Sequence, residues 1–278
     1  MERAERKYER LDRLVEAFKE DSGEYRDLTV PEGAEEKRQL LRALMNIRPP
    51  RAMAEATLAL QDEYLRARAE EKGVVTLSEL PTLREAYGSA VPLADVLCLW
   101  QGDITRLVCD AIVNAANSGM LGCFVPLHNC IDNCIHSFAG VQLRSECGQR
   151  MAELRRRYGP DYEQPTGVPM LTDAYNLPAR KVIHVVGPIV ADELNEGLER
   201  DLAACYGNVL DLCLAEGLRS VAFCCLSTGV FRFPPRRAAE IATATVTQWL
   251  TVHSGAMDRV IFNVFNDRDR AIYEALLA

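Results

Sequence analysis

The sequence predicts an α/β fold in which a largely parallel β-sheet follows a helical N-terminal region. From about Leu93 onward, short apolar runs alternate with amphipathic segments of helical length. Apolar strands separated by helices are typical of parallel sheets that are buried on both faces. Before that point, apolar side chains recur at helical spacing, and Pro49-Pro50 ends one of the helices. We therefore predict a helical extension over residues 1–90 and an α/β domain over residues 91–278.

Individual elements can be predicted from the same patterns. The expected strands are the runs 96–100, 111–113, 182–186, 220–226 and 259–265. The expected helices of the α/β region lie around 134–157, 198–216, 236–251 and 267–277. Helices are also expected around 11–18, 35–47 and 52–71. No chemical site is evident in these first helices, which predicts a helical cap or an interaction surface.

The composition is that of an ordinary folded protein and argues against several classes of function. The chain has 278 residues, 48% hydrophobic and 26% charged, with a formal net charge of −8. General nucleic-acid binding is not expected at this charge, because neutralising phosphates dominates that affinity. No apolar run approaches the roughly 20 residues that span a bilayer, and the charged start lacks the apolar core of a signal peptide. We expect a cytoplasmic protein whose ten cysteines are thiols rather than disulfides.

Small polar segments follow three of the predicted strands. They are Gln101–Thr105, Asn114–Ser118 and Ser227–Phe231. In open parallel sheets, ligands bind beyond the carboxyl ends of the strands, so these segments are the first candidates for a site. The third segment places Ser-Thr-Gly before an aromatic residue, and the N–H groups of such a tight loop can converge on phosphate oxygens.

A cluster of cysteine and histidine residues lies between the second and third of these segments. Cys123, His128 and Cys130 supply thiolate and imidazole donors on one short stretch, and both donor types suit zinc. Three protein ligands leave a position open for water or substrate, which is typical of a catalytic metal site. The alternative is a loop whose cysteines are merely buried. Cys134 and His136 are competing ligand candidates, since a helix here would bring Cys134 one turn past Cys130.

Four motifs of the α/β region together resemble those of the macrodomain family. They are Gly102-Asp-Ile-Thr105, Asp110-Ala-Ile-Val-Asn-Ala-Ala-Asn-Ser118, Val182-Ile-His-Val-Val-Gly-Pro188 and Ser227-Thr-Gly-Val-Phe-Arg-Phe-Pro234. They occur in that family's order over about residues 93–278. The resemblance implies a three-layer α/β/α macrodomain sandwich with a cleft for ADP-ribose.

The resemblance also implies which residues bind ADP-ribose. Asp103 would accept a hydrogen bond from the adenine amino group, and Ile104 would lie against the adenine ring. Asn117 would contact the hydroxyl groups of the distal ribose. The diphosphate would be wrapped by a loop of four residues, with Phe231 near the distal ribose; the loop is Ser227, Thr228, Gly229 and Val230. Asp103 has little evident structural role, whereas Asn114 is open to the alternative of capping a strand end.

The cysteine and histidine cluster is similar to the zinc-containing branch of the macrodomains, which also carries a helical N-terminal extension. The pattern Asn-Ser-x-x-Leu-Gly-Cys-Phe-x-Pro-x-His-x-Cys-Ile-Asp-Asn runs without a gap from Asn117 to Asn133. Hydrolytic macrodomains without zinc carry a run of glycines at this place. The resemblance implies that Cys123, His128 and Cys130 bind Zn²⁺.

The other cysteines and histidines near this segment have less defined roles. The resemblance favours a packing role for Cys134. His136 is either a partner of the site or a core histidine, and His184, inside an apolar strand, is expected to be structural.

The resemblance, together with these residues, implies a zinc-dependent hydrolase that removes mono-ADP-ribose from modified proteins. The bond at the distal ribose anomeric carbon would be cleaved through an oxocarbenium-like state, which requires a positioned water. Asp132 would be the base or water-orienting group and Asn117 would assist it, although Asp132 could alternatively be a helix N-cap. Zinc would activate water or hold the ribose hydroxyls.

Three alternative functions are open from the sequence. The first is a non-catalytic reader of ADP-ribose, and the second is a deacetylase of O-acetyl-ADP-ribose that uses the same cleft. The third is a nucleotide- or RNA-binding module, which the acidic balance disfavours. The expected partners are an ADP-ribosylated protein and ADP-ribose itself, and the zinc branch further implies a sirtuin-type ADP-ribosyltransferase and a lipoyl-carrier protein.

Overall fold

A computed structural model describes residues 2–278 and, from residue 9 on, their side chains. Contacts divide the chain into two compact units. The helical unit comprises the chain up to Gly73 together with Leu121–Asp161 and Tyr175–Leu177, and the sheet unit comprises Val74–Met120, Tyr162–Ala174 and Pro178–Ala278. The segment with the cysteine and histidine cluster therefore packs with the N-terminal helices. The predicted division into residues 1–90 and 91–278 stays a prediction.

The helical unit confirms the helices predicted before residue 90. Helices α1 (Glu2–Ser22), α2 (Ala34–Ile47) and α3 (Glu55–Lys72) share a small apolar core with helix α6 (Val141–Tyr158). This core contains Leu11, Leu14, Val15, Phe18, Leu41, Leu44, Met45, Tyr64, Leu65 and Val141. The apolar side chains lie on one face of each helix because they recur every three or four residues.

The long helix predicted around 134–157 is in fact two helices, α5 (Ile131–Ala139) and α6. Gly140 separates them with φ 99°, a backbone conformation that favours glycine. A β-carbon at this position would lie 2.6 Å from Nε2 of Gln61 on α3. Gln61 is fully buried and accepts a hydrogen bond from the N–H of Val141 at 3.2 Å, so α3 packs against the break.

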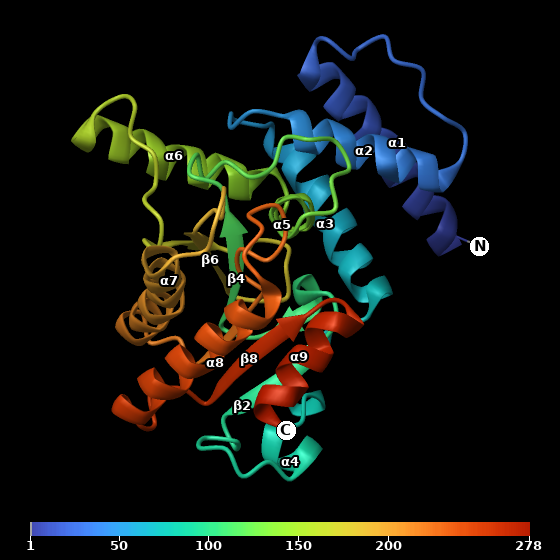
Figure 1. Ribbon diagram of the computed structural model, residues 1–278. Coiled ribbons are helices and arrows are strands. Elements are labelled where there is room, and N and C mark those ends of the chain that lie inside the picture. Colours follow the sequence, from blue (N-terminus) through green and yellow to red (C-terminus); the bar gives the residue numbers. More distant parts are fainter. Residues whose placement is uncertain (1) are drawn as a thin grey trace. The chain divides into compact units, whose positions relative to one another are not determined.

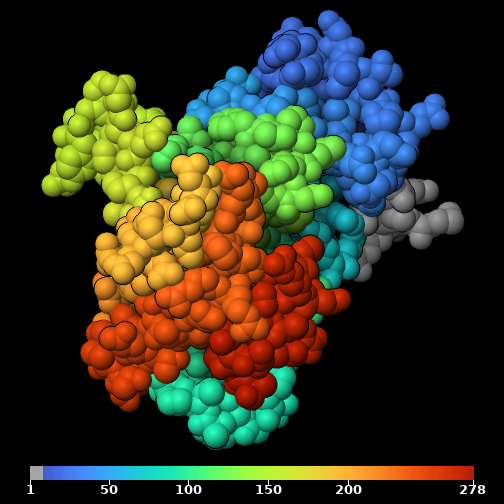
Figure 2. Space-filling view, viewed as in Figure 1, coloured from blue at the N-terminus to red at the C-terminus, as the bar shows by residue number. Residues whose placement is uncertain are grey.

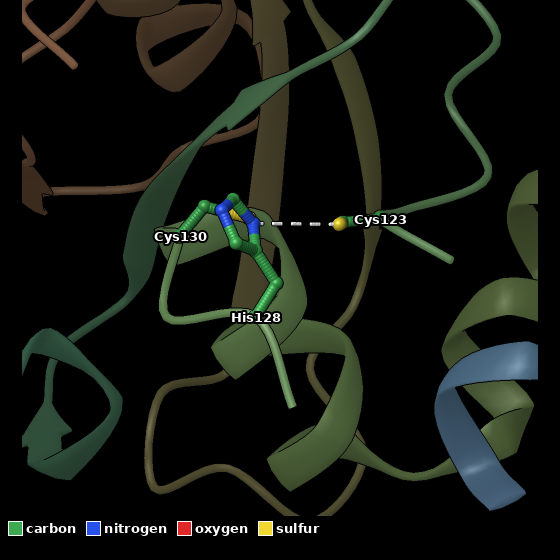
Figure 3. A group of neighbouring side chains, drawn as sticks. All are labelled: Cys123, His128 and Cys130. Carbon is green, nitrogen blue, oxygen red and sulfur yellow. Dashed lines mark hydrogen bonds between the residues drawn. The ribbon is translucent and has the colours of Figure 1, made fainter. Parts of the chain in front are cut away.

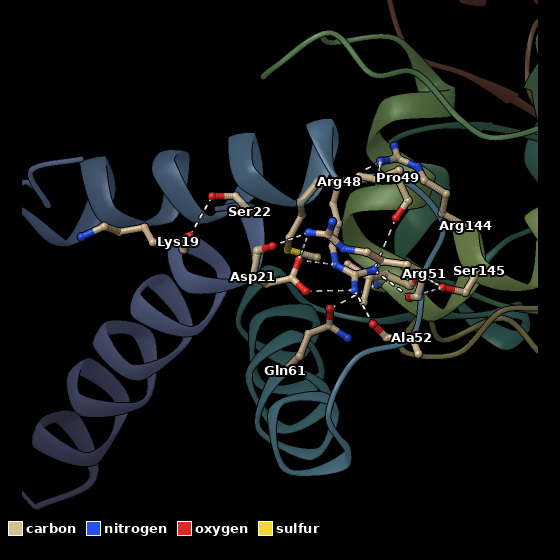
Figure 4. A network of polar contacts seen from close by, with 12 residues as sticks. Lys19, Asp21, Ser22, Arg48, Pro49, Arg51, Ala52, Gln61, Arg144 and Ser145 are labelled. Atoms are coloured by element: carbon tan, nitrogen blue, oxygen red, sulfur yellow. Dashed lines mark hydrogen bonds and ion pairs between the residues drawn. The ribbon is translucent and has the colours of Figure 1, made fainter. Parts of the chain in front are cut away.

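Ion pairs connect the ends of α1 and α2 (Figure 4). Arg48 Nε donates to Asp21 at 2.9 Å, and the same guanidinium donates to the carbonyl of Ala52 at 2.8 Å. Arg51 donates to the same carboxylate at 2.6 Å. Burial alone would raise the pKa of Asp21, but the two guanidinium groups outweigh that effect and lower the pKa. The end of α2 is therefore fixed against the end of α1 by charge.

The sheet unit contains a six-stranded mixed sheet (Figure 1). Its strand order is β2–β8–β7–β4–β6–β5, and every neighbouring pair is parallel except β5 and β6. The strands are β2 (Leu97–Gln101), β4 (Ala111–Ala116), β5 (Met170–Asp173), β6 (Lys181–Val186), β7 (Ser220–Phe223) and β8 (Arg259–Val264). A separate parallel pair consists of β1 (Val75–Thr76) and β3 (Leu107–Val108).

Four helices belong to this unit: α4 (Leu83–Tyr87), α7 (Glu196–Ala215), α8 (Pro235–Val252) and α9 (Asp267–Leu277). The last two lie side by side at the surface (Figure 2). The five predicted strands and the three helices that follow residue 195 are confirmed, whereas the antiparallel edge strand β5 was missed. No helix of the described chain has both the length and the apolar character needed to cross a membrane.

Candidate functional site

The three polar segments predicted as a site follow neighbouring parallel strands of the sheet unit. Strands β2, β8, β7 and β4 are consecutive in the sheet, so their carboxyl ends share one edge. Asp103 follows β2, Ser227 follows β7, and Asn117 follows β4. Phe265, directly after β8, is 79% exposed at the same edge. Ligands of open parallel sheets bind at such an edge.

Asp103 has a structural role that the sequence did not reveal. Its Oδ1 atom accepts hydrogen bonds from the N–H of Thr105 at 3.0 Å and from the Thr105 hydroxyl at 2.5 Å, capping the short 3-10 helix Ile104–Arg106. The side chain of Ile104 is 1% exposed, so stacking it on a base would require this turn to move. Gly102 is required here because a β-carbon would lie 2.3 Å from the Trp100 ring.

The loop after β7 has features of an anion site. Ser227 adopts φ 64°, and its hydroxyl is buried with no hydrogen-bond partner among the described residues. A β-carbon on Gly187 would lie 2.1 Å from that hydroxyl oxygen, so the glycine permits the close approach. The N–H groups of Gly229, Val230 and Phe231 donate no hydrogen bond within the described chain. Open amides and an unsatisfied hydroxyl on one loop are what a phosphate requires.

Strand β4 contains a buried asparagine, and the segment after it contains an exposed one. Asn114 lies inside β4, and its Nδ2 is 3.0 Å from Nδ1 of His184, whose Nε2 is 3.0 Å from the hydroxyl of Thr172. The alternative that Asn114 caps a strand end is therefore wrong, because the strand continues to Ala116. All three side chains are buried, so this network serves packing. Asn117 is exposed, and its Oδ1 accepts from the N–H of Gly119 at 3.1 Å.

In the helical unit, the three predicted metal ligands lie together (Figure 3). One donor atom from each of Cys123, His128 and Cys130 lies within 4.8 Å of the others. The Sγ atom of Cys123 is 3.6 Å from Nδ1 of His128. Two ligands on a tetrahedral zinc ion, with bonds of about 2.3 Å to sulfur and about 2.0–2.1 Å to nitrogen, lie about 3.6 Å apart. The donor types and this one distance therefore fit a zinc ion.

The surroundings of Cys130 set the protonation state of its thiol. Its Sγ accepts a hydrogen bond from the N–H of Asn133 at 3.4 Å and caps helix α5. Burial, together with the nearby Cys123 thiol, raises the pKa of Cys130 to about 12. Without a cation this cysteine is a neutral thiol near pH 7. Binding a metal as thiolate would therefore release a proton.

Asp132 lies in the first turn of α5 and is 5% exposed. The alternative that it caps this helix is wrong, since the cap is Cys130. Its Oδ1 is instead 3.6 Å from Nε2 of His136, one turn along. Cys134 is absent from the donor set and its Sγ is 3.6 Å from Nη2 of Arg42, which agrees with a packing role.

Comparison with known proteins identifies the family. Residues 113–242 match the family model of the Macro domain. A protein-ADP-ribose hydrolase of Treponema medium is 44% identical over 266 residues, covering 95% of this chain and 97% of that relative. The chain belongs to the macrodomain family.

Further relatives support the assignment of the chain to the macrodomain family. A protein-ADP-ribose hydrolase of Staphylococcus aureus (strain MRSA252) is 39% identical over 269 residues, covering 95% of this chain and 94% of the relative. The crystal structure of the Trypanosoma brucei macrodomain in complex with ADP-ribose has a TM-score of 0.63 and 31% identity, and covers 84% of this chain and 94% of that one. The predicted α/β macrodomain fold with a helical N-terminal region is thereby confirmed.

Sequence reasoning missed the side chain that supports the loop of the macrodomain's donor set. Arg144 on α6 is 4% exposed and donates to the carbonyls of Leu121 at 2.7 Å and Cys123 at 3.3 Å. Its guanidinium carbon lies 4.2 Å from the centroid of the Phe124 ring. Helix α6 contains several arginines, so the sequence gives no signal that Arg144 in particular has this role.

Proposed function

We propose that this macrodomain is a zinc-dependent hydrolase that removes mono-ADP-ribose from modified proteins. The observation that carries the proposal is the donor set of Cys123, His128 and Cys130. A protein that only binds ADP-ribose has no need of such a set. The names of the Treponema and Staphylococcus relatives support hydrolysis of protein-linked ADP-ribose.

The edge of the sheet unit supplies the proposed ADP-ribose site. The open amides and buried hydroxyl of the loop after β7 would bind the diphosphate. Asp103 would hold the adenine amino group through its carboxylate. Phe265 would stack on the base, because it is an exposed aromatic side chain directly after β8, the strand next to β2. The ADP-ribose bound to the Trypanosoma macrodomain supports the ligand class.

The proposed reaction is hydrolysis at the anomeric carbon of the distal ribose. The bond from this carbon to the acceptor atom of the protein breaks, and the oxygen of a water molecule takes its place. Asp132 would orient this water and accept its proton, which then passes to the leaving group. Asn117 would hold the ribose hydroxyls, for which its side chain is exposed. Zinc, when bound, would supply a positive charge that lowers the pKa of water or polarises an oxygen.

The proposal is tested by measuring turnover and binding separately. Release of ADP-ribose from a modified protein is compared in wild type, Cys123→Ala and Asp132→Asn, with Cys134→Ala as a matched control. We expect Asp132→Asn to lower turnover by about 10²- to 10⁴-fold, the usual contribution of general acid–base catalysis. Cys123→Ala should lose both zinc and turnover, and the affinity for ADP-ribose should change little in either variant.

Three other outcomes have definite meanings. Undiminished turnover by Asp132→Asn would remove that residue from the mechanism. Zinc-loaded wild type that binds ADP-ribose but releases none would indicate a reader, and release of acetate alone from O-acetyl-ADP-ribose would indicate the deacetylase. For the implied partners, an assay with a lipoyl-carrier protein modified by a sirtuin-type ADP-ribosyltransferase is the direct test.

A further inference from the structure

His128 is the last residue of a turn whose backbone conformation is sterically unfavourable at one position. The turn runs from Val125 to His128, and the N–H of His128 donates to the carbonyl of Val125 at 3.2 Å. Pro126 suits the second position, but Leu127 occupies the third with φ 58°, where glycine or asparagine is usual. The Leu127 side chain is 38% exposed, so burial does not hold it in place. The turn therefore depends on hydrogen bonds from its surroundings.

One of these hydrogen bonds comes from helix α2. Asn46 is 1% exposed, and its Oδ1 accepts from the N–H of Leu127 at 3.0 Å. Its Nδ2 donates to the hydroxyl of Ser137 on α5 at 2.8 Å. A single buried amide thus uses both its acceptor and its donor to connect the turn with α5.

A second side chain of α2 holds the other end of the turn. Nη2 of Arg42 donates to the carbonyl of His128 at 2.9 Å and to Oδ1 of Asn133 at 2.8 Å. Asn133 is fully buried, and its Nδ2 donates in turn to the carbonyl of Val125 at 2.9 Å. Both ends of the turn are therefore connected to Arg42, directly or through Asn133.

We propose that Arg42 and Asn46 are positioning residues that set the geometry of the Cys123, His128 and Cys130 donor set. Both lie on helix α2 (Ala34–Ile47), outside residues 113–242 that match the Macro domain model. The N-terminal helices would then, through α2, set the geometry of the metal site, which differs from the cap or interaction surface that we expected. This inference rests on the proposed zinc site, because a metal is what the positioned imidazole would serve.

The effect on a bound metal follows from how ligands are oriented. A metal requires its donors in a fixed arrangement, and removing groups that orient the ligands typically weakens metal affinity about 10- to 100-fold. Neither Arg42 nor Asn46 supplies a ligand atom to the set. Substituting them should therefore leave the ligands present and disturb their placement.

The test uses the full chain with Zn²⁺ and Co²⁺ as probes. Zinc dissociation constants are measured by competition with a chromogenic chelator in wild type, Arg42→Met, Arg42→Lys and Asn46→Ala. The thiolate-to-cobalt charge-transfer and ligand-field bands report the geometry of the donor set. Arg38→Met is the matched control, since Arg38 lies one turn earlier on the same helix and pairs with Glu35.

We expect Arg42→Met and Asn46→Ala to weaken zinc binding about 10- to 100-fold and to alter the cobalt spectrum. Arg38→Met should match wild type in both. Arg42→Lys keeps the charge, but its ammonium ends a shorter side chain and cannot occupy the place of Nη2, the single atom that donates to both acceptors, so it should resemble Arg42→Met. Recovery of wild-type affinity by Arg42→Lys would show a charge effect and overturn positioning by Arg42.

Two further results separate this inference from the proposed function. If wild type binds zinc and both substitutions leave its affinity and the cobalt spectrum unchanged, the positioning role is wrong and the zinc site stands. If wild type binds neither metal, the zinc site itself fails. Should Asn46→Ala not fold, the comparison of Arg42→Met with Arg42→Lys and Arg38→Met still decides the matter for Arg42.

Discussion

Replacing Arg144 with methionine should destabilise the helical unit more than any exposed substitution on α6. The guanidinium donates to the carbonyls of Met45 at 3.1 Å, Asn46 at 2.6 Å and Arg48 at 2.7 Å, besides those of Leu121 and Cys123. The carbonyls at the end of α2 lack partners within the helix, so Arg144 satisfies groups that would otherwise be buried and unpaired.

The size of the effect follows from these five hydrogen bonds. Nη1 shares its two N–H groups among the carbonyls of Met45, Asn46 and Arg48. A bond to a charged donor contributes about 1.5–3 kcal/mol, so four to five bonds at the lower figure give about 6–7.5 kcal/mol. Burial lowers the pKa of Arg144 to about 10, so the cost of desolvating the charged guanidinium offsets part of this gain. We therefore expect Arg144→Met to lower the free energy of unfolding by about 3–5 kcal/mol, as for breaking other buried charge contacts.

Urea unfolding followed by circular dichroism measures this loss. Arg150→Met is the matched control, because Arg150 is an exposed residue of the same helix that pairs with Glu146 at 2.7 Å. Exposed pairs contribute about 0–1 kcal/mol, so the control should stay within that range. A loss below about 1 kcal/mol in Arg144→Met would refute the reasoning, because it would mean that these carbonyls find other partners.

Three further predictions follow from single residues. Gly122→Ala should weaken zinc binding about 10-fold or more. Gly122 has φ 80°, and a β-carbon would lie 2.7 Å from the His136 ring, so the substitution should displace the loop before Cys123. Chelator competition measures the zinc affinity, and an unchanged affinity would contradict the prediction. Phe265→Ala should weaken ADP-ribose binding by about 1–3 kcal/mol in calorimetry if the base stacks there, and wild-type affinity would exclude stacking. In Asp110, burial raises the carboxyl pKa, but hydrogen bonds from the Arg219 N–H, Arg180 and Ser220 outweigh burial and lower it. A carboxyl whose pKa is lowered by folding stabilises the fold at pH values above its unfolded-state pKa of about 3.9. Asp110→Asn should therefore lower the free energy of unfolding by about 1–2 kcal/mol at pH 6–7, and this loss should vanish as the pH falls through the folded-state pKa. A loss that does not depend on pH would contradict this account.

The strands and most helices could be predicted because their signal is local. Continuous apolar runs such as Val182–Val186 give buried parallel strands, and the recurrence of Leu11, Leu14, Val15 and Phe18 gives one face of α1. The grouping of Cys123, His128 and Cys130 was also accessible, since the three residues lie within eight residues of sequence. Local patterns were sufficient in each case.

The features that were missed depend on contacts between distant parts of the chain. The break at Gly140 is set by Gln61 on α3, and the end of α2 is satisfied by Arg144, about a hundred residues further on. Antiparallel β5 is short and lies at the sheet edge, where its pattern is weak. The cap that Asp103 forms on Thr105 is local, and it was missed for another reason: the carboxylate that accepts this hydrogen bond is the same group that a ligand would use.

The most direct test of zinc-dependent hydrolysis is a zinc titration of metal-stripped full-length protein, with released ADP-ribose measured against bound metal. Turnover should be absent at the start, rise in proportion to zinc, and level off at one zinc ion per chain. Full turnover before any metal is added, in protein shown to contain none, would contradict the account.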